Sequence, residues 1–206
     1  MLRNRLAPLV LGVVLLISGC GGEMSLTEYV EEINSIVARA SQRYEALIAT
    51  PQGAVLVAEG AHLLEFTPRD LHAALERVGE IGDEVQEATG AVEPPDEVAD
   101  LHAFWFETDD QRFTSAQAAL AARAGTTTDW DELSVSPEMA AYRAALAADK
   151  EACADFQAKL DATEERGVFA DTPWIPGELK EVVDILLGCE GYPEHPEDVY
   201  RPPPDG

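Results

Sequence analysis

The sequence predicts an all-α protein: an up-down antiparallel four-helix bundle with a short C-terminal helix and a disordered tail. Three observations lead to this fold. Apolar residues recur at three- and four-residue steps over four long segments, Pro and Gly separate these segments, and no segment with strand-like composition has an evident partner strand. Each segment carries one apolar face, so the four together can enclose a single core.

The first predicted helix begins after Ser25. Ser25-x-x-Glu28 has the form of a capping box, in which each residue's side chain accepts a hydrogen bond from the other's backbone. An apolar stripe then runs from Leu26 to Ile48. The breakers at 50–53 end this helix.

The second predicted helix begins after Thr67 and ends at Gly90. Thr67 supplies a capping hydroxyl, Pro68 suits the first turn, and Asp70 is an acid near the N-terminus. Residues 54–66, between the first two helices, are rich in Val and Leu. Because no partner strand is evident, we expect a short helix or a packed loop there rather than a strand.

The rest of the bundle follows by the same reasoning. A third helix is predicted over 96–125, a polar loop over 126–136, and a fourth helix from there to about residue 167. A short helix is predicted over 179–187. The Pro-rich acidic tail, residues 190–206, is expected to be extended or disordered.

The N-terminus has the features of a secretory signal peptide. Arg3 and Arg5 precede an apolar run, residues 6–17, that is too short to cross a bilayer comfortably as a helix. Ile17-Ser18-Gly19-Cys20 closes the run and resembles the bacterial lipobox. The resemblance implies cleavage after residue 19 and diacylglycerol on Cys20, with further acylation such as palmitate. The alternatives are an ordinary signal peptide with a chance Cys and an uncleaved anchor.

These features give the expected domain organisation and location. Residues 1–19 are the signal peptide, 20–25 an acylated tether, and 26–189 the helical bundle domain. Two acyl chains anchor stably, so we expect a lipid-anchored protein on the extracytoplasmic face of the cell membrane. Gly21 follows the Cys, so by resemblance the Asp signal for inner-membrane retention is absent, and the outer membrane is possible in a cell with two membranes.

The composition is strongly acidic. Removing residues 1–19, which contain Arg3 and Arg5, takes the formal charge from −25 to −27, and only three lysines remain in the chain. Nucleic acid and anionic lipid surfaces both attract a basic face, so this balance argues against either partner. We expect the acidic residues to be a solvated surface, with cation binding or a basic partner as the alternative.

The two other cysteines, Cys153 and Cys189, form an even pair in an exported protein. A disulfide between them is therefore the default expectation, and it would pin the C-terminal helix onto the fourth helix. In the chain-entropy account, such a loop adds about 3–4 kcal/mol of stability. Two free buried thiols are the alternative, and a peptide map under non-reducing conditions distinguishes the two.

A second resemblance covers most of residues 26–190. The Glu93-Pro94-Pro95 break, His102, and the Cys153 and Cys189 pair look like the ectodomain pattern of small uncharacterised helical bacterial lipoproteins. This resemblance favours the helical fold and implies no activity.

No metal or cofactor site is predicted, although a few residues are candidates. Glu59-x-x-His62 matches one ligand pair of ferritin-like di-iron bundles, but the second such pair is missing. His102, Asp109 and Asp110 are further candidates for a site that holds a cation or a small cationic molecule. Histidines that satisfy core hydrogen bonds and acids that face water are the simpler interpretation.

No catalytic residue is predicted either, and we do not expect an enzyme. The sequence has no nucleophile elbow, phosphate-binding Gly loop, zinc-type Cys spacing or dinucleotide fingerprint. We therefore expect an interaction or accessory protein of the cell envelope with a possible protein partner. A ligand- or cation-binding lipoprotein with a site between helices is the alternative. The aromatic run 104–106 covers more than half of a helix circumference, so either its helix is buried or one ring is exposed to a partner.

The anchor leads to a direct test. Cys20→Ala removes the only thiol available for thioether formation at this site, so metabolic lipid labelling should stop and the domain should appear in the medium or periplasm. The wild-type chain, labelled in parallel, is the control. Unchanged membrane retention of the variant would contradict the lipoprotein assignment.

Overall fold

The computed structural model describes residues 24–104, 110–165, 167–168 and 193–203, and these residues are helical with no β-strand among them. The all-α prediction is confirmed. The elements, in chain order, are α1 (Leu26–Ile48), the 3₁₀ helices η1 (Gly53–Val57) and η2 (Gly60–Glu65), α2 (Pro68–Gly90), α3 (Ala99–His102), α4 (Asp110–Ala124), α5 (Trp130–Ser134), α6 (Pro137–Glu165) and the 3₁₀ helix η5 (Pro196–Asp198).

The predicted starts of the first two helices are confirmed by their caps. The Ser25 backbone N–H donates to the Glu28 carboxylate (3.0 Å), and the Glu28 N–H donates to the Ser25 hydroxyl oxygen (3.3 Å). Thr67 and Asp70 repeat this reciprocal pair at the start of α2, where Pro68 is the first helical residue. Each cap satisfies backbone donors that the first turn leaves without partners.

The segment between α1 and α2 forms two short 3₁₀ helices. Of the two expected alternatives, a short helix or a packed loop, the structure shows the helical one. Val55 of η1 and Leu63 of η2 are completely buried. These two side chains anchor the segment in the core, although it lacks the long apolar stripe of an amphipathic helix. Gly53 permits the tight turn that precedes it. A Cβ at this position would lie 1.9 Å from the Leu47 carbonyl oxygen, so only glycine fits.

The predicted third helix is described in two pieces. It starts at Ala99, three residues later than expected, and α3 continues into two residues with π-helical conformation. Residues 105–109 lie outside the described part, and α4 follows. The expected polar loop over 126–136 instead contains α5, because Trp130 and Leu133 are buried there and Asp129 caps the helix with its carboxylate.

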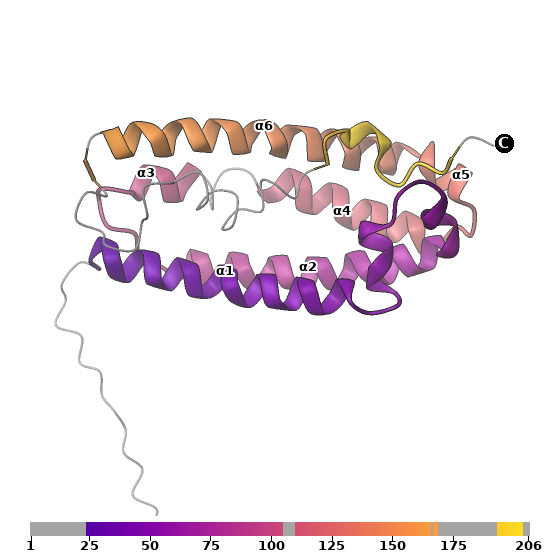
Figure 1. The fold of residues 1–206 in the computed structure, drawn as a ribbon, viewed down its shortest axis with the longest axis horizontal. Coiled ribbons are helices and arrows are strands. Elements are labelled where there is room, and N and C mark those ends of the chain that lie inside the picture. Colours follow the sequence, from indigo (N-terminus) through magenta and orange to yellow (C-terminus); the bar gives the residue numbers. More distant parts are fainter. Residues whose placement is uncertain (1–23, 105–109, 166, 169–192, 204–206) are drawn as a thin grey trace, which may run out of the picture.

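The helices lie side by side along the long axis of the molecule (Figure 1). α1 packs on α2, α2 on α4, and α4 on α6, while α3 contacts α6. The α1–α2 connection with η1 and η2 lies at the end opposite to the start of α1, and α5 lies at that same end. We call this the far end. Within the described residues, no helix combines the length and apolarity that crossing a membrane requires.

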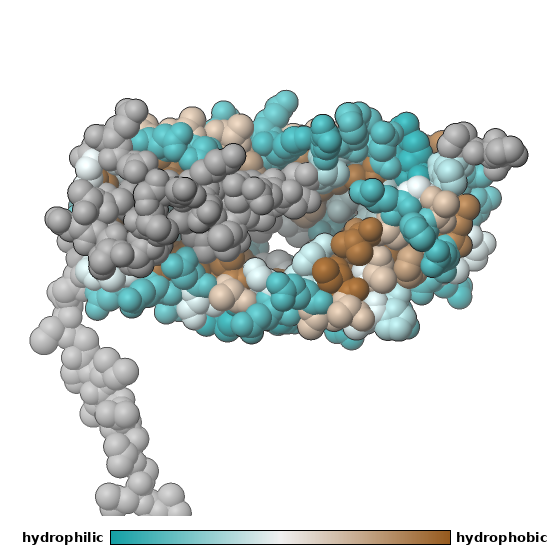
Figure 2. Space-filling view, in the orientation of Figure 1, coloured by the Kyte–Doolittle hydropathy of each residue, from teal (hydrophilic) through white to brown (hydrophobic). Residues whose placement is uncertain are grey.

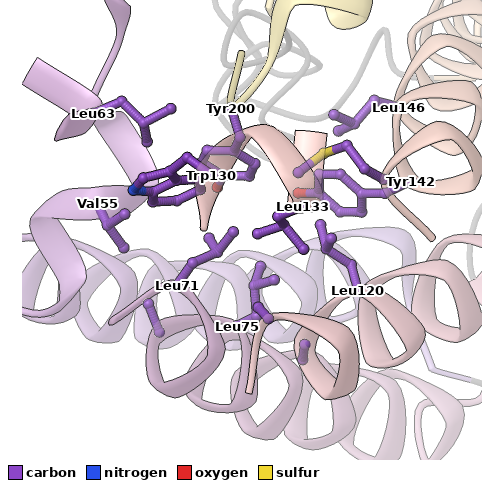
Figure 3. Close-up of a cluster of buried hydrophobic side chains, with 14 residues drawn as sticks. Val55, Leu63, Leu71, Leu75, Leu120, Trp130, Leu133, Tyr142, Leu146 and Tyr200 are labelled. Carbon is purple, nitrogen blue, oxygen red and sulfur yellow. The ribbon is translucent and has the colours of Figure 1, made fainter. Parts of the chain in front are cut away.

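The apolar core is divided into two clusters. The main cluster fills the far end and is drawn in Figure 3. Its buried members come from η1, η2, α2, α4, α5, α6 and the C-terminal residues: Val55, Leu63, Leu71, Ala74, Leu75, Leu120, Ala121, Ala124, Trp130, Leu133, Met139, Tyr142, Leu146 and Tyr200. The second cluster joins the first half of α1 to α3 and α6 through Tyr29, Val30, Ile33, Ile36, Val92, Val98, Leu101 and Leu160.

The prediction of a disordered tail is wrong for residues 193–203. These residues pack against α6, and both Pro196, the first residue of η5, and Tyr200 are buried. Burial of a tyrosine ring removes a large apolar surface from water, which offsets the entropy of ordering a Pro-rich acidic segment. The short C-terminal helix predicted over 179–187 lies outside the described residues.

Two neighbouring leucines of η2 provide a matched test of this packing. Leu63 is fully buried in the main cluster, whereas Leu64 is 57% exposed. Leu63→Ala should lower the free energy of unfolding by about 2–5 kcal/mol, and Leu64→Ala should change it by less than about 0.5 kcal/mol. Urea unfolding of both variants, followed by circular dichroism, checks this. Equal losses would contradict the described packing of η2.

Candidate functional site

The cysteine of the predicted lipid anchor and one of the two cysteines of the predicted disulfide lie outside the described part of the chain. Cys20 precedes residue 24, and Cys189 falls between residues 168 and 193. Cys153 is buried on α6. Acylation of Cys20 and the Cys153–Cys189 disulfide therefore stay predictions.

His62 is on the surface. Its side chain is 81% exposed, and its Nδ1 lies 2.8 Å from a carboxylate oxygen of Glu65. Glu59 is the exposed residue that precedes η2, with an extended backbone conformation. The Glu-x-x-His ligand pair of ferritin-like bundles requires an α-helix that faces the bundle interior. η2 instead has 3₁₀ geometry, and its histidine faces water rather than a bundle interior.

His102 is in the opposite environment. It is buried at the end of α3, and its Nδ1 is hydrogen-bonded to the Tyr29 hydroxyl at 3.0 Å. The two rings meet edge to face with centroids 5.8 Å apart. This contact joins α1 to α3 within the second cluster, so His102 satisfies a core hydrogen bond, which is the simpler of the two interpretations of this residue.

The candidate ligands are not brought together where the structure describes them. His62 is an exposed residue of η2, and His102 is buried against α1. Asp109 lies outside the described residues, and Asp110 is the first residue of α4, where the backbone alone is described. Within the described ranges, no group of three or more His, Cys, Asp or Glu side chains is placed to hold a metal ion.

The aromatic run 104–106 is described at its first residue only. The Phe104 ring stacks on Phe156 of α6 with centroids 6.2 Å apart, and the Lys159 ammonium lies 4.8 Å from the centre of the same ring. Phe104 is thus half-buried, and the side chains that cover it belong to α6. Trp105 and Phe106 lie outside the described residues.

The most developed set of contacts surrounds the C-terminal segment, residues 193–203. Tyr200 of this segment stacks on Trp130 of α5 (centroids 6.4 Å apart) and on Tyr142 of α6 (6.3 Å). Figure 3 shows the three rings together at one side of the main cluster. The Trp130 indole N–H donates to the Phe66 carbonyl oxygen (2.8 Å), which fixes the plane on which Tyr200 lies.

Two cationic side chains of α6 bind the backbone of the same segment. Arg143 donates from Nε (2.9 Å) and Nη2 (2.8 Å) to the Val199 carbonyl oxygen, and its Nη1 donates to the Ser134 carbonyl oxygen (2.9 Å). Lys150 donates to the carbonyl oxygens of Pro193 (3.4 Å) and Glu194 (3.2 Å). We call Trp130, Tyr142, Arg143 and Lys150 the segment site.

Burial changes the ionisation of these groups. Burial raises the pKa of Tyr142 and of Tyr200 well above that of a free phenol, and the two side chains are hydrogen-bonded to each other. Burial is also the main cause that lowers the pKa of Arg143, with a further contribution from the nearby Arg201 guanidinium. The tyrosines therefore stay neutral at ordinary pH and act as hydrogen-bonding groups.

Sequence reasoning missed the segment site. Its signal was present in the tail, where Val199-Tyr200 is an apolar and aromatic pair within an otherwise polar, Pro-rich stretch. Arg143 and Lys150 could also have been singled out from the sequence, because basic residues are few in this acidic chain. The prediction for the tail relied on its Pro-rich, acidic composition and gave these single residues too little weight.

A second surface feature lies at the far end. Val57 is 58% exposed and Leu64 is 57% exposed, and these residues belong to η1 and η2. On the face drawn in Figure 2, hydrophobic residues gather mainly over this end, while much of the other described surface is hydrophilic. The acid Glu59 lies between the two residues in sequence, Glu65 follows Leu64, and both acids are also exposed. Exposed apolar residues with a charged rim are typical of interaction surfaces.

The Tyr29–His102 contact predicts a dependence of stability on alkaline pH. Burial raises the pKa of Tyr29 to about 12, whereas a tyrosine in the unfolded chain ionises near pH 10. The unfolded state therefore loses its proton first, and the contribution of Tyr29 to stability, complete below pH 10, is lost as the pH rises through 12.

Tyr29→Phe should remove this contribution. The slope of unfolding free energy against pH between 10 and 12 should become shallower by up to about 1.4 kcal/mol per pH unit. Urea titrations of both proteins at several pH values measure the two slopes, and Tyr142 and Tyr200 are unchanged in this comparison. Identical slopes would contradict the burial of the Tyr29 phenol.

Comparison with known proteins finds no matching family model, no matching curated protein and no matching solved structure. The resemblances to the lipobox and to small helical lipoproteins accordingly stay predictions from the sequence. The function is argued below from the residues and contacts described above.

Proposed function

We propose that this chain is a lipid-anchored, extracytoplasmic lipoprotein that acts without catalysis as an interaction or accessory protein of the cell envelope. The proposal joins the lipobox at Cys20 to the position of α1. This helix begins at Leu26, so at most six residues separate the acylated Cys from the folded domain. Six extended residues reach about 20 Å, which keeps the start of α1 close to the lipid.

The far end would then be the part of the domain that is presented away from the membrane. α1 has 23 residues and is therefore about 35 Å long. The exposed Val57 and Leu64 lie in the connection that follows α1. This exposed apolar pair at the end opposite to the tether is the observation that carries the proposal, because it favours contact with another protein.

Both candidate histidines take part in local contacts. His62 is paired with Glu65 at the surface, and His102 is hydrogen-bonded to Tyr29 in the core. A ligand- or cation-binding lipoprotein is the alternative to the proposed role.

We also propose that the chain forms an up-down antiparallel four-helix bundle. The four long members are α1, α2, the α3–α4 pair and α6. Contacts between α1 and α2, α2 and α4, and α4 and α6 support this order, because helices that follow one another in the chain are neighbours in space.

The Cys153–Cys189 disulfide is part of the same proposal. Lys150, one helical turn before Cys153, contacts the carbonyl oxygens of Pro193 and Glu194. Pro193 is only four residues after Cys189 in the sequence. Four residues reach at most about 14 Å, so a bond between Cys189 and Cys153 is compatible with this contact.

The exposed pair leads to a test in cells. We expect the wild-type lipoprotein, crosslinked in growing cells and purified from membranes, to carry a reproducible partner protein. Val57→Asp with Leu64→Asp should reduce the recovery of this partner at least tenfold, because charges at the centre of an apolar contact must lose their water without a counterion.

Ala154→Asp with Ala158→Asp is the matched control. Both alanines are exposed on α6, near Leu160 of the second cluster and away from the far end. This control should leave partner recovery unchanged. The membrane fraction and the folding should be the same for all three proteins. A partner that is retained by the Val57 and Leu64 double variant would contradict the role of this end, and no reproducible partner for the wild type would contradict the proposed function.

A further inference from the structure

The C-terminal segment occupies its site as a docked peptide would. One side chain, that of Tyr200, is buried between two aromatic rings, and the flanking backbone is bound through its carbonyl oxygens. Peptide-binding sites combine these two features, because side-chain pockets give specificity and backbone hydrogen bonds give affinity.

The site is organised by residues other than the segment itself. Arg143 is oriented by its hydrogen bond to the Ser134 carbonyl oxygen, and Trp130 by its bond to the Phe66 carbonyl oxygen. Both partners belong to the folded domain before residue 165. Groups that are held in place before binding lose less freedom when a ligand arrives, so this site is pre-organised.

Charge complementarity specifies the ligand. The segment carries three acids, Glu194, Glu197 and Asp198, against one arginine, Arg201. The site presents Arg143 and Lys150, and Asp198 attracts the Arg143 guanidinium while Arg201 repels it. In a chain with 39 acids and 14 basic residues, two cations that face one segment are a local exception. The site therefore matches a ligand that is acidic and carries a tyrosine.

We propose that the segment site is a peptide-binding site for an acidic, tyrosine-containing segment of a partner protein, and that residues 193–203 fill it as an internal competitor. This proposal rests on the proposed interaction function. It adds the segment site as a second binding surface, besides the exposed apolar residues of the far end, and states the chemistry of its partner. Release of the internal segment exposes Trp130 and Tyr142 and leaves the second cluster intact, because Tyr200 is not a member of that cluster.

The probe for the test is a fluorescent synthetic peptide of residues 193–206. Fluorescence anisotropy follows its binding to the mature full-length chain and to the Tyr200→Ala variant, whose site is complete but whose own segment lacks its anchor. We expect saturable binding to the variant and at least tenfold weaker binding to the wild type. A folded Tyr200→Ala chain that does not bind the probe would overturn the proposal.

Two altered probes test the chemistry. A peptide with Tyr200→Ala should lose binding, and one with Glu194→Gln, Glu197→Gln and Asp198→Asn should bind at least tenfold more weakly at low salt, with the difference reduced at high salt. Equal binding of all three peptides would show that the site does not recognise an acidic tyrosine segment, which overturns the proposal.

A second measurement keeps the test valid if Tyr200→Ala does not fold. Excess probe, added to the wild-type chain, should accelerate amide exchange at Asp198, Val199 and Arg201 of the chain's own segment; no acceleration would overturn the proposal.

Sedimentation of the wild type measures whether the site binds a second copy of the chain. A dimer that is lost when the acids of the segment are neutralised would assign the site to a second copy and would equally overturn the proposal. None of these measurements involves the anchor or the far-end surface, so their failure is distinguishable from failure of the proposed function.

Discussion

The stacking of Tyr200 on Trp130 and Tyr142 closes the main apolar cluster. Without the Tyr200 ring, one side of the cluster would be exposed to water. The other members of the cluster come from helices that are far apart in the sequence. Arg143 adds to this interaction, because it binds the carbonyl oxygen of the residue before Tyr200 and so holds the C-terminal segment against α6. A tail that composition alone describes as polar thus becomes part of the folded domain.

The two clusters give the two ends of the molecule different properties. The second cluster holds the start of α1 through buried contacts with α3 and α6, and its polar group, His102, is satisfied by Tyr29. The main cluster holds the far end, where α5, η1 and η2 combine buried residues with exposed apolar ones. The fully buried side chains Val55, Leu63 and Leu133 belong to the main cluster, so the exposed apolar residues of the far end lie on a well-packed base.

Local signals predicted the helices well, because caps and apolar periodicity depend on residues that are close in sequence. The Ser25 and Thr67 caps, both with their acids three residues later, are examples. The segment site was not predictable in this way. Tyr200 and Trp130 are seventy residues apart, and their contact depends on how α5 and α6 meet. The Glu59–His62 pattern had the right spacing for an α-helix, but the 3₁₀ geometry of η2 and the exposure of His62 are set by the packing of Val55 and Leu63.

Amide hydrogen exchange of the wild-type mature chain tests the central claim, that the end of the chain is part of the fold. The backbone N–H groups of Asp198 and Arg201 donate to the carbonyl oxygens of His195 and Asp198, each at 3.0 Å. With Tyr200 anchored, these amides should exchange at least tenfold more slowly than in the free peptide of residues 193–206, and Tyr200→Ala should remove the difference. Exchange in the wild-type chain at the rate of the free peptide would contradict the account.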